Sequence, residues 1–264
     1  MSGVRATRGI LMSVHILHRL FFCSVLWIFS ITTVSAQETV PAVTGEYPPY
    51  TGEKLPSGGI ATAIVDLALK AAGFAKTDVL WTSWTRGHTL TKVGKVAMTF
   101  PYVHNEERTQ DFLFSDPLYT DRISYFVRPQ DLNGLSGAWH EMRICLPQGW
   151  AISLHQDFID QFSLSLLQPI SMKHCFNMLD AKRVDIVPCA DHVAAYETKN
   201  IFGKSDVFAV SNYAYLERKY YAMISRNWLD AEDLRQKLNI GLTKIRNSGA
   251  YARILEPYQI NSHE

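Results

Sequence analysis

The sequence predicts an α/β fold made of two units of similar plan. Up to residue 122, apolar residues at helical spacing alternate with short apolar runs that are typical of buried strands. The same alternation starts again after Pro129, and extended segments separate the two series. Strands that alternate with helices form a parallel sheet covered by those helices. We therefore expect each unit to be a mainly parallel sheet flanked by helices.

In the first unit, apolar residues over 60–71 recur on one face of a helix, and Gly73 is suited to end it. Apolar runs at 79–81 and 97–100 predict strands, and the segment 84–93 between them predicts a second helix.

In the second unit, apolar runs predict strands at 143–146, 164–170 and 184–187, with a helix over 175–179. Extended segments at 123–127 and 207–210 lie at its two boundaries. The chain is therefore expected to pass between the units twice.

A last helix is expected over 231–246, with Asp230 as its cap and the residues from Asn247 to Gly249 as its end.

The N-terminus has the order of features found in a secretory signal. Three arginines precede an apolar run over 20–31, and the small residues 34–36 follow it. This run is too short for a bilayer-spanning helix, which needs about twenty residues. We expect cleavage after Ala36, which makes 1–36 a signal peptide, and export to the periplasm. The sequence leaves open whether translation starts at Met1 or at Met12.

Charge and motifs exclude several classes of function. The 26 lysines and arginines, less the three of the signal, leave 23 against 25 acidic residues, which does not favour nucleic-acid binding. The Gly-x-Gly-x-x-Gly turn, the phosphate-binding loop and the Gly-x-Ser-x-Gly elbow are all missing. Histidines are scattered without metal-ligand spacing. We therefore expect no metal and no cofactor.

Three cysteines remain after cleavage, and an exported protein permits a disulfide between two of them. Spacing allows Cys145 to pair with Cys175 or with Cys189, and three buried free thiols are an equal alternative. We take Cys145 and Cys175 as the candidate pair.

The segment TFPYVHNEER (99–108), followed by FLFSDPLY (112–119), is the most distinctive part of the sequence. It resembles the bacterial extracellular solute-binding protein family 3, the periplasmic substrate-binding proteins of polar amino-acid ABC transporters. The likeness continues in the expected order over most of the chain, at 47–50, 84–86, 175–179, 183–185 and 245–251.

This resemblance implies a two-lobed periplasmic binding protein fold of type II, with two crossing hinge segments. Lobe 1 would comprise 37–122 and 211–264, and lobe 2 would comprise 123–210. The implied function is to capture a small organic solute, an amino acid or another carboxylate, in the cleft between the lobes. The protein would be a monomer that delivers this ligand to an ABC transporter permease in the inner membrane.

Arg108 matches the family arginine that binds the ligand carboxylate. A guanidinium offers paired donors that fit a carboxylate. The alternative is a surface ion pair with Glu106 or Asp111.

The sequence also departs from the amino-acid receptors. Pro101 and Val103 stand where glycine and a hydroxyl residue are common in the family. Asp191 lies one residue beyond the place of the acid that holds the ligand ammonium. An aromatic or other carboxylate therefore remains open as the ligand.

Aromatic residues and one acid complete the expected ligand site. Tyr47, Trp84, Tyr102 and Trp150 are candidates for the apolar walls of the cleft, although each tryptophan is equally suited to the core. Asp191 is a candidate partner for a ligand cation, and capping of the following helix is its alternative role.

Two rival functions share the fold that the resemblance implies. A cyclohexadienyl dehydratase-like enzyme would need a proton donor in the cleft, for which Glu46 is the candidate. An accessory ligand sensor would present its ligand to a receptor. No acid and base pair stands out in the sequence, so we expect a binding protein and not an enzyme.

Overall fold

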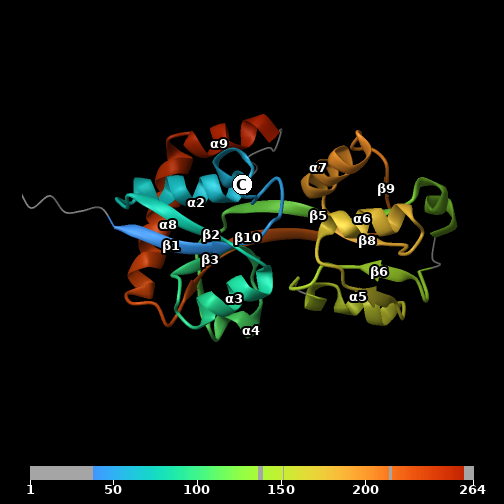
Figure 1. Cartoon of the computed structure of the whole chain (residues 1–264), viewed down its shortest axis with the longest axis horizontal. Coiled ribbons are helices and arrows are strands. Elements are labelled where there is room, and N and C mark those ends of the chain that lie inside the picture. Colours follow the sequence, from blue (N-terminus) through green and yellow to red (C-terminus); the bar gives the residue numbers. More distant parts are fainter. Residues whose placement is uncertain (1–37, 136–138, 151, 214–215, 259–264) are drawn as a thin grey trace, which may run out of the picture. The chain divides into compact units, whose positions relative to one another are not determined.

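The computed structural model describes residues 38–258, except 136–138, 151 and 214–215 (Figure 1). The predicted signal peptide and its cleavage site lie outside these residues. Of the segments that are described, none forms a helix with the length and apolar character of a membrane span.

Most strands belong to one sheet with the order β2-β1-β3-β10-β5-β8. Strands β1 (Thr39–Thr44), β2 (Lys76–Trp81) and β3 (Met98–Val103) pair in parallel. The neighbouring strands β10 (Leu216–Ser225), β5 (Tyr119–Val127) and β8 (Val187–Ala190) continue the sheet with antiparallel pairing. Two short strands pair at the side of this path: β4 (Phe112–Phe114) with β10, and β9 (Ala209–Val210) with β5.

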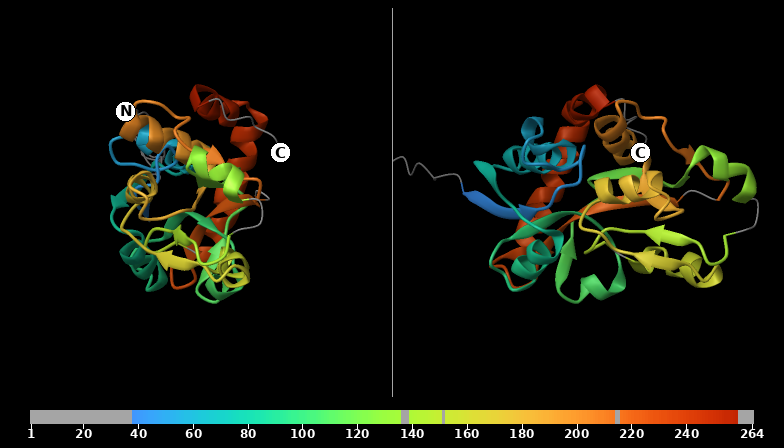
Figure 2. Two further views of the ribbon diagram at one scale, coloured as in Figure 1. Left: turned by 90° about the vertical axis from the view of Figure 1, so that its right-hand side faces the viewer. Right: turned by 45° about the vertical axis from the view of Figure 1, so that its right-hand side comes forward.

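Helices cover both faces of the parallel strands. Helix α2 (Ile60–Ala71) and helix α3 (Trp84–Lys92) lie on opposite sides of β1 and β3 (Figures 1 and 2). Helix α2 packs against α8 (Ala231–Asn247) and α9 (Ala250–Leu255). The other helical segments here are η1 (Pro56–Gly58), α4 (Glu106–Thr109) and η4 (Glu256–Tyr258).

A second sheet joins β6 (Arg143–Cys145) to β7 (Ser165–Leu167) in parallel. Around it and β8 lie η2 (Pro129–Leu135), η3 (Ile152–Leu154), α5 (Gln156–Gln161), α6 (Met172–Asp180) and α7 (Asp191–Phe202). Cys145 at the end of β6 forms a disulfide with Cys175 in α6, and Cys189 is a buried free cysteine. The bridge ties a strand to the helix that covers it.

The long strands β5 and β10 connect the two groups of elements (Figure 1). They pair from Leu216 opposite Ile123 to Tyr220 opposite Tyr119. The sequence predicts extended chain at 123–127 and 207–210, and β5 and β9 fall there. Strand β10 was not predicted, although it pairs with β3, β4 and β5.

Predicted helices and most strands are confirmed within a few residues, with two corrections. The strand expected at 184–187 begins only at Val187, because the chain before it makes a single bridge from Ile186 to Ile144 instead of a continuous ladder. Asp230 does not cap α8 with its side chain: its backbone is left-handed, with φ at 55°, and only its carbonyl accepts from Leu234.

Candidate ligand-binding site

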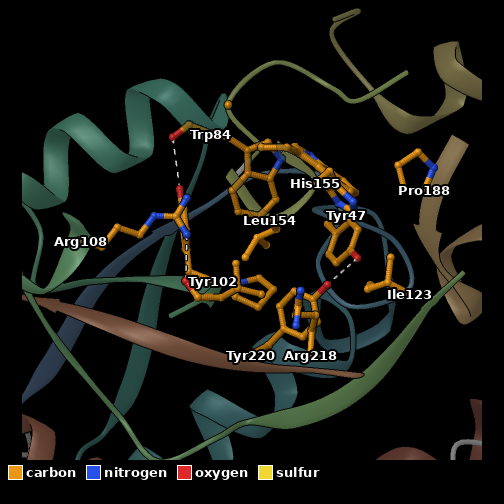
Figure 3. Close-up of a pocket in the computed structure, with 14 residues that line it drawn as sticks. Tyr47, Trp84, Tyr102, Arg108, Ile123, Leu154, His155, Pro188, Arg218 and Tyr220 are labelled. Carbon is orange, nitrogen blue, oxygen red and sulfur yellow. Dashed lines mark hydrogen bonds between the residues drawn. The ribbon is translucent and has the colours of Figure 1, made fainter. Parts of the chain in front are cut away.

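A cavity of about 80 Å³ lies beside the paired strands β5 and β10 (Figure 3). Its walls come from segments that are far apart in the sequence. The β1 to α2 loop, the start of α3 and the end of β3 supply one side, and the segments around η3 and β8 supply the other. Five of the six predicted ligand residues line it: Tyr47, Trp84, Tyr102, Arg108 and Trp150.

Aromatic rings in edge-to-face contact form one part of the wall. The ring of Tyr47 lies 5.2 Å from Trp150 and 6.5 Å from Trp84 between centroids, and Trp84 lies 5.6 Å from Tyr102. The hydroxyls of Tyr47 and Tyr220 are 3.4 Å apart (Figure 3). Burial raises the pKa of both hydroxyls, so they stay neutral donors. The wall is thus apolar with a few hydroxyls, as is usual for small-molecule sites.

Two glycines make room for Trp84. A Cβ at Gly45 would lie 2.7 Å from the Trp84 ring, and a Cβ at Gly149 would lie 3.1 Å from its Cβ. Gly149 also has φ at +81°, which residues with a side chain rarely adopt. These close approaches let the loop after β6 reach the start of α3, and this places Trp150 beside Tyr47.

Arg108 reaches the cavity from helix α4. Its backbone N–H donates to the Asn105 side chain at 2.9 Å, and its Nη1 donates to the Val103 carbonyl at 2.9 Å. The guanidinium lies over the Tyr102 ring, with Cζ 4.9 Å from the centroid. These contacts fix its direction (Figure 3).

The predicted alternative for Arg108 was an ion pair with Glu106 or Asp111. Asp111 instead pairs with Lys92 at 2.7 Å, and no carboxylate of the described residues lies at ion-pair distance from Arg108. Burial lowers the pKa of Arg108, which reflects partial removal of this charge from water. The charge is therefore available to an anionic ligand.

A second hollow of about 410 Å³ adjoins the first and shares Trp84, Tyr102, Arg108 and Trp150 with it. It adds polar residues, among them Lys92 at the end of α3, Glu107 in α4 and Asp111 after α4. Arg108 thus stands where the two spaces meet.

The lining residues that were not predicted from the sequence include Leu154, His155, Arg218 and Tyr220. His155 is buried, and this burial together with the positive charge of Arg218 lowers the pKa of the imidazole to about 4. Its Nδ1 lies 3.4 Å from the Tyr125 hydroxyl. The ring is therefore neutral near pH 7.

The two acids considered for the site lie elsewhere. Asp191 does not line the cavity, and its Oδ2 accepts from Arg122 Nε at 2.6 Å. Glu46 does not line it either, and its Oε1 accepts from the Glu53 backbone N–H at 3.0 Å. No aspartate or glutamate of the described residues lines this cavity, and no group of them suits a metal ion.

Solved structures of similar fold include three of different roles. An amino acid ABC transporter substrate-binding protein from Streptococcus pneumoniae, bound to L-arginine, has a TM-score of 0.68 at 20% identity, over 83% of this chain and 93% of that one. A histidine kinase sensor domain with similarity to periplasmic binding proteins has a TM-score of 0.70 at 17% identity, over 85% and 97%. An ancestral amino acid-binding protein, a precursor of cyclohexadienyl dehydratase, has a TM-score of 0.68 at 16% identity, over 83% and 95%.

At these identities the likeness establishes the fold, which is the two-lobed periplasmic binding protein fold that the sequence predicts. A search of curated protein sequences gives no significant match. The profile of one family matches residues 40–261, which is most of the chain. The chain therefore belongs to the bacterial extracellular solute-binding proteins, family 3.

Proposed function

We propose that this protein captures a small organic carboxylate in the cavity and delivers it to an ABC importer. Solute binding follows from membership of the family. Delivery to an importer is supported by the similar fold of the substrate-binding protein from Streptococcus pneumoniae. The ligand-contacting residues in this proposal are Arg108, Tyr47, Trp84, Tyr102 and Trp150, whereas Asp191 is assigned to its ion pair with Arg122.

The main support for this function is the positive charge of the cavity wall. Arg108 offers a guanidinium without a carboxylate partner, while no acid of the described residues faces the same space. A buried charge is stable only when it is paired or hydrogen-bonded. A ligand carboxylate meets this need, whereas an α-ammonium group would find no carboxylate here. The wall of this cavity therefore favours a carboxylate without an ammonium group.

Closure of two lobes explains how such a ligand is held. We place lobe 1 at 37–122 and 211–264, and lobe 2 at 123–210, with β5 and β10 as the connecting strands. The contact of Tyr47 with Trp150 then joins one lobe to the other across the cavity. Hinge closure removes the ligand from water, which strengthens its polar contacts.

Export belongs to the same proposal. Removal of residues 1–36 by a signal peptidase would release a monomer into the periplasm, where the permease of the importer is its partner. The family description as extracellular agrees with this location.

The position of Glu46 outside the cavity favours a binding protein over an enzyme. Dehydration of a carboxylated ring needs a proton donor near the ligand. Glu46 hydrogen-bonds its own loop outside the cavity, and His155 is neutral with a pKa of about 4.

A thermal-shift screen with product analysis tests this function. Aliphatic and aromatic carboxylates, their matched amines and α-amino acids are each added to the purified protein. A ligand at a hundred times its dissociation constant stabilises the protein by about 2.7 kcal/mol, which raises Tm by several degrees. We expect carboxylates to raise Tm and to be recovered unchanged. Shifts with amines alone, or conversion of the hit, would contradict the proposal.

A further inference from the structure

Arg218 points into the same cavity from the connecting strand β10. Side chains two residues apart in a strand lie on the same face. Tyr220 lines the cavity with its hydroxyl against Tyr47, and Arg218 lines it two residues earlier (Figure 3). The side chain is only half-buried, but its Nε has lost contact with water.

The guanidinium of Arg218 lacks a strong partner among the described residues. Its Nε–H is buried and makes no hydrogen bond, and Nη1 has one long contact of 3.4 Å, to the carbonyl of the adjacent Glu217. A buried donor without an acceptor is costly and calls for an explanation. Nε together with one Nη is also the edge of a guanidinium that grips a carboxylate by two parallel bonds.

The acid that pairs with Arg218 across the two strands already accepts hydrogen bonds from other residues. Asp121 lies opposite Arg218 in the register of β5 and β10. Its Oδ2 accepts from the Tyr50 hydroxyl at 2.6 Å, and its Oδ1 accepts from the Arg122 backbone N–H at 2.8 Å and lies 3.3 Å from His192 Nδ1. No ion pair joins it to Arg218. Asp121 therefore does not neutralise the charge of Arg218.

The wall therefore carries two guanidinium groups and no acid of the described residues. One ligand carboxylate on Arg108 would still leave the charge of Arg218 unpaired, at a site where its Nε is out of reach of water. Two anionic groups on one ligand neutralise both charges.

We propose that Arg218 binds a second carboxylate, so that the ligand of this protein is a small dicarboxylate. This inference rests on the proposed function, in which Arg108 binds the first carboxylate. The aromatic rings that line the same cavity would contact the carbon skeleton.

Titration calorimetry with matched probes tests the inference. The probes are pentanoate with glutarate, and benzoate with terephthalate, each a monocarboxylate beside its dicarboxylate. We expect wild type to bind at least one dicarboxylate about tenfold or more tighter than its monocarboxylate. Arg218→Gln should weaken binding of that dicarboxylate by about tenfold to a hundredfold and change that of the monocarboxylate much less.

Two further variants separate binding from structure. Lys219→Gln removes one positive charge from the neighbouring exposed position outside the cavity, and should leave both affinities unchanged. Arg218→Met should be at least as resistant to heat as wild type without ligand, because it removes a buried donor that has no acceptor.

Equal loss of both probes in Arg218→Gln would overturn the inference, because it would mean that Arg218 shares the single carboxylate of Arg108. Binding of monocarboxylates without a gain for dicarboxylates would overturn it too, and would leave the proposed function standing. If neither class bound to wild type, the proposed function itself would fail.

Discussion

The lowered pKa of His155 shows that the cavity disfavours a further positive charge beside its arginines. The ring is 8% exposed, and burial, followed by the charge of Arg218, brings its pKa to about 4 from an ordinary value of 6.5. An imidazole held neutral in this way can contact an anionic ligand only as a hydrogen-bonding group. The positive charge at the site is therefore confined to Arg108 and Arg218.

The lowered pKa of His155 predicts a loss of stability in acid. Between pH 6.5 and 4 the unfolded chain binds a proton at this histidine and the folded protein does not, so the free energy of unfolding falls as pH falls through this window. The loss from this one group approaches about 3 kcal/mol at pH 4. Urea unfolding of wild type and His155→Gln at several pH values measures it.

The expected result is a difference between the two stability curves that changes over this window and is constant above it. Parallel curves from pH 7 to pH 4 would mean that His155 titrates alike in the folded and unfolded states.

At the scale of elements, the packing of α8 on α2 depends on one glycine. A Cβ at Gly241 would lie 1.9 Å from the carbonyl oxygen of Ala68, which belongs to the backbone of α2. Only a shift of one helix against the other would relieve such an overlap. Both helices contribute fully buried residues to the main core, among them Ile64 and Leu238.

Gly241→Ala should therefore destabilise the protein, although alanine favours a helix by about 1 kcal/mol over glycine. Overpacking of a core costs about 1–3 kcal/mol and occasionally more, which lowers Tm by several degrees. Ile240→Ala, on the exposed side of the same helix, is the matched control and should change stability by less than about 0.5 kcal/mol. An unchanged Tm in Gly241→Ala would show that α8 shifts freely against α2.

Elements with a clear apolar period were predictable from the sequence. Helix α2 has buried residues at 60, 61, 64, 65 and 68, which is one face of a helix, and its observed bounds equal the predicted ones. Strand β10 escaped prediction because its first half carries Glu217, Arg218 and Lys219, whose charges hide the alternation of a strand. These residues are held extended by pairing with β5, a contact that no local pattern reveals.

Some residues of the candidate site were likewise predictable from the sequence and others were not. Arg108, Tyr47, Trp84 and Tyr102 lie in motifs that resemble a known family, so their meeting in one cavity was predictable, whereas Trp150 lies outside these motifs. Arg218 and His155 lie in segments without a motif and reach the cavity only through β10 and through the turn before α5. Asp191, expected near the ligand, is drawn to Arg122 on β5 instead.

At the scale of the whole molecule, the cavity proposed to bind an anion lies beside the two connecting strands, between elements distant in the sequence. Arg108 and Trp84 belong to the part before β5, and Trp150 and His155 belong to the part after it. In the proposed function, a ligand that touches both sets would stabilise a closed arrangement over an open one. Such a change of shape is what a membrane partner would recognise.

Titration calorimetry of Arg108→Gln with a carboxylate tests whether this arginine binds the ligand. Benzoate or glutarate, whichever gives the larger thermal shift with wild type, serves as the probe, and the exposed Arg86→Gln on helix α3 is the control for loss of charge. Arg108→Gln should keep the Tm of the free protein and bind the probe about tenfold to a hundredfold more weakly, while Arg86→Gln should bind like wild type. Equal affinity of Arg108→Gln and wild type would show that the ligand carboxylate lies elsewhere.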